Sequence, residues 1–397
     1  MTLRDLIIGR WRAVLVLGIT QILTWGTIFY PPVLTVPLIA ADRGWTMSFA
    51  MGGFSLALLS AGVVSSRVGF LIDRYGGHRV MAAGSLLAAA GLVALVHAHD
   101  RIAYVAAWVL IGVATAASLY DSAFSTLGRI FGMAARRPIT VLTLVGGFAS
   151  TVSWPCTHFL IENVGWRGTY FVYAALLAGV AAPLHAFALP RERAEHVAPE
   201  PEAAKPSTTG TLAPKGRAFV LVAASFAAYA FVPSGLSAHL LAIFGRAGID
   251  PATAVSIGAL FGPSQVAARL GEFVLARRLH PLALARIAVG TLLVGFALYG
   301  LFGVSVFIAA IFMILFGVAN GLVTIARGAV PLALFGAKGY GHIMGRIGGA
   351  ALIMQAIAPF ALAFAAERGS DAMLLAIVAG FAMLAFIGLA AIRPAAT

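Results

Sequence analysis

Long apolar runs follow one another along almost the whole chain, and short polar turns separate them. Hydrophobic residues make up 61% of the 397 residues and charged residues only 10%, whereas soluble domains carry about a quarter charged residues. The runs are long enough for helices that cross the ~30 Å hydrocarbon core of a bilayer. They lack the alternation of membrane β-strands, so we expect an all-α membrane protein.

We expect twelve transmembrane helices. The first is expected to stay in the protein as a span and not to be cleaved as a signal peptide, because its apolar run is too long for a signal-peptide core. Their expected ranges are 13–39, 46–68, 79–97, 102–131, 139–161, 168–189, 217–244, 252–276, 282–301, 304–334, 340–366 and 371–392. The long polar stretch near the midpoint has too few apolar residues to build a core and reads as a linker. The expected domains are an N-terminal six-helix bundle (1–189), a cytoplasmic linker (190–216) and a C-terminal six-helix bundle (217–397).

The formal net charge of +13 is unevenly distributed over the turns. With the N-terminus inside, the inside turns hold Arg4, Arg10, Arg12, Arg74, Arg79, Arg129, Arg136, Arg137, Arg191, Arg193, Lys205, Lys215, Arg217, Arg277, Arg278, Arg286, Lys338 and Arg393. The outside turns nearly cancel, with Asp42, Arg43, Asp100, Arg101, Glu162, Arg167, Arg246, Asp250, Glu367, Arg368 and Asp371. This is the positive-inside pattern, so both termini are expected in the cytoplasm. We therefore expect a lipid bilayer, and no nucleic acid, as the partner of the basic surface.

Short matches between the two halves indicate an internal repeat. Each pair is separated by a little over two hundred residues: Ile111-Gly112-Val113-Ala114 with Phe316-Gly317-Val318-Ala319, Ser66-Arg67-Val68-Gly69 with Ala268-Arg269-Leu270-Gly271, and Gly146-Gly147 with Gly348-Gly349. Three matches at nearly one spacing favour a single duplication, and therefore two pseudo-symmetric six-helix bundles.

A charged segment after the second span carries the family resemblance. It reads Gly69-Phe70-Leu71-Ile72-Asp73-Arg74-Tyr75-Gly76-Gly77-His78-Arg79. The segment resembles the cytoplasmic loop between the second and third helices of the major facilitator superfamily, with the pattern Gly-x-x-x-Asp-Arg/Lys-x-Gly-Arg-Arg/Lys. We interpret Gly69, Asp73, Arg74, Gly76 and Arg79 as a gating motif whose charged side chains pair with neighbouring helix ends in one transport state. After Gly271 the copy is degenerate, with Leu275 and Ala276 in place of Asp73 and Arg74, so the latch is expected to be one-sided.

The resemblance implies the superfamily's mechanism. Substrate binds near the midplane between the two bundles, and rocking of the bundles gives alternating access. We expect a monomeric multi-pass protein of the bacterial inner (plasma) membrane.

Ionisable residues inside the spans are candidate functional residues because burying a charge in a bilayer is costly. Asp121 shares a face of the fourth span with Ser118 and Ser125. In the tenth span Arg327 shares a face with Asn320 and Thr324, and in the eighth Arg269 shares one with Gln265 and Glu272. Such polar stripes belong against a water-filled cavity. We expect Glu272 to pair with Arg269 or with the loop at Arg277 and Arg278.

The eighth span carries a narrower resemblance. Gly262-Pro263-Ser264-Gln265-Val266-Ala267-Ala268-Arg269 looks like the same span of the monocarboxylate-transporter branch and its bacterial relatives. In that branch an Asp-x-x-x-Arg pair handles a carboxylate and a proton. Arg269 matches the arginine, Gln265 stands in place of the acid, and the branch's lysine in the first span has no match. A guanidinium can bind a carboxylate through two parallel hydrogen bonds, so Arg269 suits a small organic anion.

Several assignments stay open at this stage. Asp121 is the first candidate for proton coupling and His239 the second, while Asp121 and Arg327 could also form a purely structural pair. Arg269 and its counterpart Arg67 could instead be anchors that reach the bilayer surface. By superfamily analogy the first, fourth, seventh and tenth helices line the cavity, so we include Tyr30 and Tyr229 among the substrate-binding candidates.

We predict a secondary active transporter that moves a small, monocarboxylate-like anion by alternating access, coupled to protons in symport. The alternative is a proton-driven antiporter that exports a drug or metabolite, although the fifth span lacks the Gly-x-x-x-Gly-Pro-x-x-Gly-Gly run of superfamily antiporters. A substrate-sensing relative that does not transport also stays open. The sequence has one cysteine, no His-rich motif and no phosphate-binding Gly-x-x-x-x-Gly-Lys-Ser/Thr loop, so we expect no enzyme, no metal and no cofactor.

Overall fold

The computed structural model describes residues 9–191, 216–275 and 279–393, and within these ranges the chain is helical without strands. The first half contains α2 (Arg12–Thr24), η1 (Trp25–Phe29), α3 (Pro32–Arg43), α4 (Met47–Tyr75), α5 (Gly77–His97), α6 (Arg101–Ser118), α7 (Tyr120–Phe131), η2 (Gly132–Ala135), α8 (Arg136–Gly146), α9 (Ala149–Leu176), η3 (Leu177–Ala181) and η4 (Leu184–Ala188). The second contains α10 (Arg217–Arg246), α11 (Pro251–Ala259), α12 (Phe261–Leu275), α13 (Pro281–Phe302), α14 (Val306–Phe335), α15 (Tyr340–Arg368) and α16 (Asp371–Ala390).

The twelve expected spans correspond to these helices. Several spans consist of more than one element: α2, η1 and α3 form the first, and α11 and α12 form the eighth. The stretch Arg101–Ala188, 88 residues long, is a nearly continuous series of helical elements and contains the fourth, fifth and sixth spans. Nine stretches of the described residues are each long and apolar enough to cross a membrane. Most of the linker expected at 190–216 lies outside the described residues.

The charged segment after the second span is almost entirely helical, which corrects our expectation of a loop. Helix α4 continues through Asp73 and Arg74 to Tyr75, and α5 begins at Gly77. Only Gly76 separates them, with a φ of 86° that favours glycine, and its N–H bonds to the carbonyl of Ile72. The charged residues at the end of the apolar run therefore extend the helix beyond it.

The internal repeat is visible in the helix packing. A Cβ on Gly112 of α6 would overlap the Ala57 carbonyl of α4, and one on Gly317 of α14 would lie 2.5 Å from the Phe261 carbonyl oxygen of α12. Gly112 and Gly317 are matched positions of the repeat, so the two halves use the same close backbone approach. The spacing of the matches thus reflects equivalent helix pairs.

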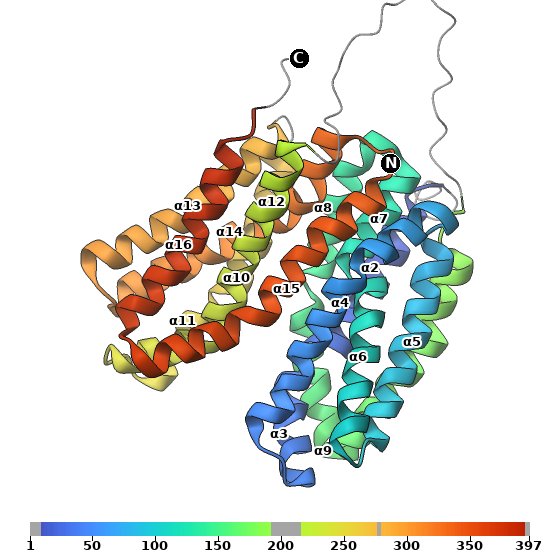
Figure 1. The fold of residues 1–397 in the computed structure, drawn as a ribbon, viewed down its shortest axis with the longest axis horizontal. Helices are drawn as coiled ribbons and strands as arrows, with labels where there is room; N and C mark the ends of the chain where they lie inside the picture. The colour runs from blue at the N-terminus through green and yellow to red at the C-terminus, as the bar shows by residue number, and fades with distance from the viewer. Residues whose placement is uncertain (1–8, 192–215, 276–278, 394–397) are drawn as a thin grey trace, which may run out of the picture.

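The two halves lie side by side at one end of the molecule and diverge toward the other (Figure 1). The start of α2 and the end of α16 lie at the first end, which we call the termini end. Contacts between the halves join α15 to α4 and α7, and α8 to α12 and α14. Along α4 and α15 the apolar contacts run from Leu58 and Ala356 toward the termini end. The halves are therefore packed together over their termini-side portions.

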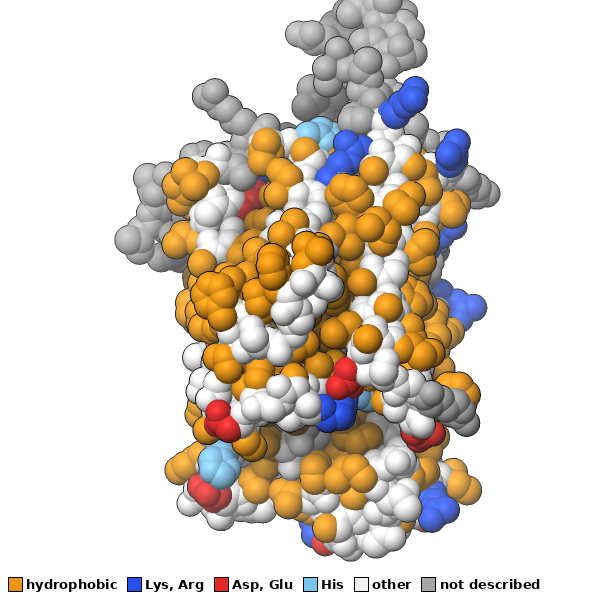
Figure 2. All heavy atoms as spheres, turned by 90° about the vertical axis from the view of Figure 1, so that its left-hand side faces the viewer, with side chains coloured by type: hydrophobic (Ala, Val, Ile, Leu, Met, Phe, Trp, Pro, Cys, Tyr) orange, Lys and Arg blue, Asp and Glu red, His pale blue; other side chains and the backbone are white. Residues whose placement is uncertain are grey.

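A broad band of hydrophobic side chains covers the middle of the face that α13, α14 and α16 help to form, and charged side chains lie mostly above and below it (Figure 2). At the end opposite the termini, several charges of the turns are paired. Arg246 holds Asp371 through three contacts of 2.6–3.0 Å, and Arg167 lies 2.6 Å from Asp42. The near cancellation seen in the sequence thus corresponds to ion pairs.

Candidate functional site

Asp121 and Arg327 form an ion pair between the halves. Helix α6 ends at Ser118, Leu119 takes an extended conformation, and α7 restarts at Tyr120, which places Asp121 in a first turn. Arg327 of α14 donates from Nη2 to the Asp121 carboxylate, and the two side chains are 20% and 11% exposed. The pairing expected from their equivalent positions in the two halves is therefore present.

Arg269 lies at the centre of a second buried cluster. Its Nη1 donates to the Thr143 carbonyl of α8 across the halves at 2.9 Å, and its Nη2 donates to Oε1 of Gln265 at 3.2 Å. The same Gln265 oxygen accepts from Asn320 at 3.0 Å. Arg269 is only 5% exposed, which removes the surface-anchor alternative for it, whereas its repeat counterpart Arg67 is exposed.

The Arg269 guanidinium has no anionic partner among the described residues. Its Nε is buried without a hydrogen-bond partner, and both of its other contacts are to neutral oxygens. Burial of an unpaired cation is costly, because water no longer solvates the charge. The cluster is therefore electrostatically incomplete and could be completed by an anion.

The repeated glycine pairs make room for these charges. A Cβ on Gly147 would lie 2.5 Å from Nη1 of Arg269, and a Cβ on Gly348 would overlap the carboxylate of Asp121. Each glycine pair thus accepts a buried charged side chain from the opposite half. The sequence showed the repeat of the pairs, but their role is apparent only from the packing.

Of the two tyrosine candidates, only Tyr30 lies near Arg269. Its hydroxyl lies near the Ser150 side chain, and the charge of Arg269 reaches the hydroxyls of both Tyr30 and Tyr120. The ring of Trp25 lies 6.0 Å from Tyr30 and 5.1 Å from Tyr120. These rings form an aromatic wall beside the cluster, and Tyr120 is a member that sequence reasoning missed.

The remaining candidates have other surroundings. Tyr229 is packed in the hydrophobic core of the second half, and its hydroxyl has no hydrogen-bond partner. His239 is half-buried, and within the described chain no hydrogen bond or ion pair joins it to Asp121, Arg269 or Arg327. Thr324 donates to the Asn320 carbonyl of its own helix at 2.7 Å.

Glu272 corrects a prediction. It does not pair with Arg269, and its other expected partners, Arg277 and Arg278, lie outside the described residues. Instead it accepts from Arg136 at 3.0 Å and from the Thr140 hydroxyl at 3.2 Å, both on α8 of the other half. Glu272 is 4% exposed, so it needs these donors. Sequence reasoning missed Arg136 and Thr140, although a lone acid in an apolar span signalled a distant partner.

Asp73 caps the start of α15. Its two carboxylate oxygens accept from the backbone N–H groups of Gly341 and His342 at 2.9 and 2.8 Å. A helix N-terminus presents unpaired N–H groups and a partial positive charge, which a carboxylate satisfies. Asp73 therefore contacts a neighbouring helix end, as expected for a gating motif.

The rest of the motif supports this contact in different ways. A Cβ on Gly69 would overlap the Gly341 carbonyl, so glycine is required for the close approach of α4 and α15. Arg74 does not reach a helix end: it is exposed and lies over the ring of Tyr75, 5.2 Å from the ring centroid. Arg129, which we had not singled out as a site residue, donates to the backbone carbonyls of Ile72 and Asp73. Arg79 is exposed.

Comparison with known proteins places these observations in a family. The family model described as Major Facilitator Superfamily matches residues 14–359. Monocarboxylate transporter 3 of Rattus norvegicus is 32% identical over 178 residues, which cover 43% of this chain and 35% of that protein. The probable anion transporter 3, chloroplastic, of Arabidopsis thaliana is 31% identical over 149 residues, which cover 36% of this chain and 28% of that protein. The matched segments thus span about a third of the length of these curated relatives.

Solved structures share the whole fold. The human organic anion transporter MFSD10 (TETRAN) superposes with a TM-score of 0.72 at 16% identity, covering 96% of this chain and 99% of that chain. The transporter FucP, in the outward conformation, also gives a TM-score of 0.72 at 12% identity, covering 95% and 97%. Identities this low show a common fold alone.

Proposed function

Because the chain belongs to the Major Facilitator Superfamily of membrane transporters and is not an enzyme, we propose that it moves a small organic anion across the membrane by alternating access. The observation that carries the proposal is the missing counter-charge of Arg269. Arg327 and Arg136 each hold a carboxylate of the opposite half, but Arg269 holds only neutral oxygens among the described residues. An anionic substrate would complete the cluster.

The substrate class we favour is a monocarboxylate-like anion. A planar guanidinium with donors on one edge matches a carboxylate well, and Gln265, Asn320 and Tyr30 add neutral polar groups around it. The curated relatives include, by their names, a monocarboxylate transporter and a probable anion transporter. Both names agree with a positively charged substrate site.

We further propose that the two bundles, 1–189 and 217–397, rock against each other about this site and that residues 190–216 connect them in the cytoplasm. The termini end would then be the cytoplasmic side of the bacterial inner membrane. Since the described contacts between the halves lie toward the termini end, the substrate would enter the site from the opposite, outer side in this conformation.

Asp121 is the group we propose to couple transport to protons. It joins α7 to Arg327 of α14, so loss of its charge would weaken one of the ionic links between the halves. A carboxylate that binds a proton only when the pair is opened would link proton uptake to the change of access. His239 is a poorer choice because nothing in the described chain connects it to these charges.

Uptake into proteoliposomes tests the substrate class. An inward proton gradient should drive accumulation of a short-chain carboxylate, and Arg269→Ala should abolish it. Arg67→Ala is the matched control, because it removes the exposed arginine at the equivalent repeat position and should leave uptake intact. Normal uptake by Arg269→Ala would refute the role of Arg269.

A separate measurement tests the coupling. Asp121→Asn keeps the shape of the side chain but cannot lose or gain the charge. We expect it to exchange substrate across the membrane without a gradient and to lose gradient-driven accumulation. Accumulation at the wild-type level would remove Asp121 as the coupling site while leaving the anion proposal standing.

A further inference from the structure

A small cavity at the termini end is lined by three cationic or titratable side chains. It has a volume of about 230 Å³ and lies between the start of α5 and the chain that follows η4. His78, Arg79 and Ala82 come from α5, and Ala186 and Arg191 come from the other wall. It lies outside the Arg269 cluster and plays no part in the proposed transport chemistry.

The cationic side chains that line this cavity have no ion-pair partner among the described residues. Within the described residues neither Arg79, Arg191 nor His78 makes an ion pair, and the charges of Arg79, Arg191 and Arg129 all reach His78. The nearby acid of the motif, Asp73, is engaged by the N–H groups of α15, and Arg129 is engaged by carbonyls of α4. The N-terminus of the 21-residue helix α5 adds its own partial positive charge. The cavity is therefore suited to an anion.

Exposed apolar side chains continue from the cavity into the region of the spans. Leu86 lies two turns along α5 from Arg79 on the same helix face and is 52% exposed. Phe187 follows the lining residue Ala186 and is 78% exposed. Since α5 packs against η4, a cationic cavity and an apolar surface adjoin each other at one edge of the molecule. A ligand that carries both a phosphate and an acyl chain fits this combination better than a free anion does.

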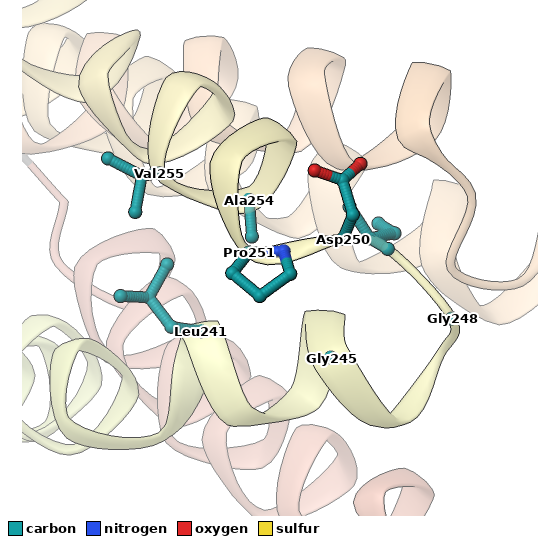
Figure 3. A pocket seen from close by; sticks show the side chains of 8 residues that line it. Leu241, Gly245, Gly248, Asp250, Pro251, Ala254 and Val255 are labelled. Atoms are coloured by element: carbon teal, nitrogen blue, oxygen red, sulfur yellow. The ribbon is translucent and has the colours of Figure 1, made fainter.

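A larger cavity, of about 460 Å³, shows the contrast. It lies at the opposite end between α10 and α11, and Figure 3 shows Leu241 and Val255 on one side of it and Asp250 on the other. No cation lines it, and the Asp250 carboxylate caps α11 through the Thr253 N–H at 3.0 Å. Of these two cavities, the one at the termini end is the one that has cationic side chains beside an apolar surface.

We propose that His78, Arg79 and Arg191 bind the phosphate of an anionic phospholipid, with its acyl chains along Leu86 and Phe187. The site would tie the α4–α5 junction, which carries Asp73, to the composition of the surrounding leaflet. This inference goes beyond the transport function and does not depend on the identity of the substrate.

The test uses the purified full-length protein in detergent. Its melting temperature and its lipid adducts in native mass spectrometry are followed while phosphatidylglycerol, phosphatidylcholine or inorganic phosphate is added. We expect phosphatidylglycerol to bind and stabilise the protein. The double variant Arg79→Gln/Arg191→Gln should weaken this binding roughly 30-fold, from about fivefold for each arginine near a membrane surface. Both arginines are exposed, so the variant should fold, which its melting temperature without lipid checks.

Arg217→Gln is the matched control, because it removes an exposed arginine at the termini end that does not line the cavity. It should bind phosphatidylglycerol like the wild type. Equal affinity of the double variant and the wild type would overturn the proposal, as would equal binding of phosphatidylcholine. Full competition by inorganic phosphate at the same concentration would assign the cavity to a free phosphate and overturn the lipid assignment.

Discussion

The two halves meet along two equivalent pairs of helices, and the two contacts are built in different ways. The repeat relates α4 to α12 and α15 to α8, so the α4–α15 contact corresponds to the α12–α8 contact. In the first, which we call the glycine interface, Gly69 meets Gly341, Ser65 meets Gly345 and Gly62 meets Gly349. In the second, which we call the charged interface, side chains make the contact: Glu272 with Arg136 and Thr140, and Arg269 with Thr143.

Both interfaces nevertheless contain a carboxylate that bridges the halves. Asp73 binds the start of α15, and Glu272 binds the start of α8. In the repeat, Glu272 corresponds to Phe70, which lies about one helical turn before Asp73. The expectation of a one-sided latch was therefore wrong. The two halves thus keep a bridging carboxylate at nearly equivalent positions, although the groups that it binds differ. The charged interface also carries Arg269, which has no anionic partner among the described residues. An anion bound to Arg269 can therefore act directly on the charged interface, whereas the glycine interface is held by close backbone contacts and the Asp73 cap.

The largest effect is expected from Gly69→Ala. Its new methyl group would overlap the Gly341 backbone, and overpacking against a backbone that cannot yield should cost about 3 kcal/mol or more. That corresponds to roughly a 100-fold shift away from the conformation closed at the termini end.

Spin labels at Ile102→Cys and Met373→Cys, on a Cys156→Ser background, report the separation of the halves at the opposite end. Gly69→Ala should shorten this distance and stop transport. Gly271→Ala, at the matched position with nothing within 4 Å, should change neither. An unchanged distance in Gly69→Ala would contradict the steric account.

Glu272→Gln should weaken the charged interface. It removes the charge that holds Arg136, and hydrogen bonds to charged groups contribute about 1.5–3 kcal/mol; the partial exposure of Arg136 places the loss toward the lower value. The same spin-label distance should show a larger fraction closed at the opposite end. Glu162→Gln, which alters an exposed pair with His158, serves as the control and should have no effect. No shift in Glu272→Gln would mean that the pair does not hold the halves together.

Asp73→Asn should have a smaller effect on the glycine interface. The amide oxygen can still accept from one N–H of α15, so the loss is one charge-assisted bond and the interaction with the helix dipole, about 1–2 kcal/mol. In the double variant Asp73→Asn/Glu272→Gln, the free-energy shifts of the two single variants should add if the two interfaces are energetically independent. A clearly non-additive double variant would show that they act as one unit.

The smallest effect concerns His280, which caps α13 beside the charged interface. Its Nδ1 accepts from the Leu282 N–H at 3.2 Å. Burial, and then the charges of Arg136 and Arg286, lower the pKa of His280 below its ordinary 6.5. Below about pH 6.5 the unfolded chain therefore takes up the proton before the folded protein does, and stability falls as the pH falls.

Melting temperatures at pH 8 and pH 5.5 measure this contribution. The drop on acidification should be smaller in His280→Gln than in the wild type. The difference should be slight, because His280 is exposed and solvent screens the effect. A larger drop in His280→Gln would contradict the sign.

The predictability of these features follows from their physical origin. The bilayer dictates helix length and apolar composition, so the twelve spans were predictable, and equivalence in the repeat predicted the Asp121–Arg327 pair. The end of α4 was missed because the polar residues from 69 to 75 extend a helix beyond its apolar part.

The Glu272–Arg136 pair joins residues far apart in the chain, so the local spacing pointed to the nearer Arg269 instead. Contacts between the halves also depend on which end of the molecule is closed. The sequence pattern within one half does not indicate which end that is.

Ligand binding to Arg269 is the most direct test of the central claim. The melting temperatures of the wild type, Arg269→Gln and Arg67→Gln are measured with a panel of short-chain carboxylates, matched neutral amides and cations. A ligand that prefers the folded state raises the stability of the protein. We predict that at least one carboxylate stabilises the wild type and Arg67→Gln, that its amide does not, and that Arg269→Gln loses the response. Equal stabilisation of Arg269→Gln by that carboxylate would contradict the account.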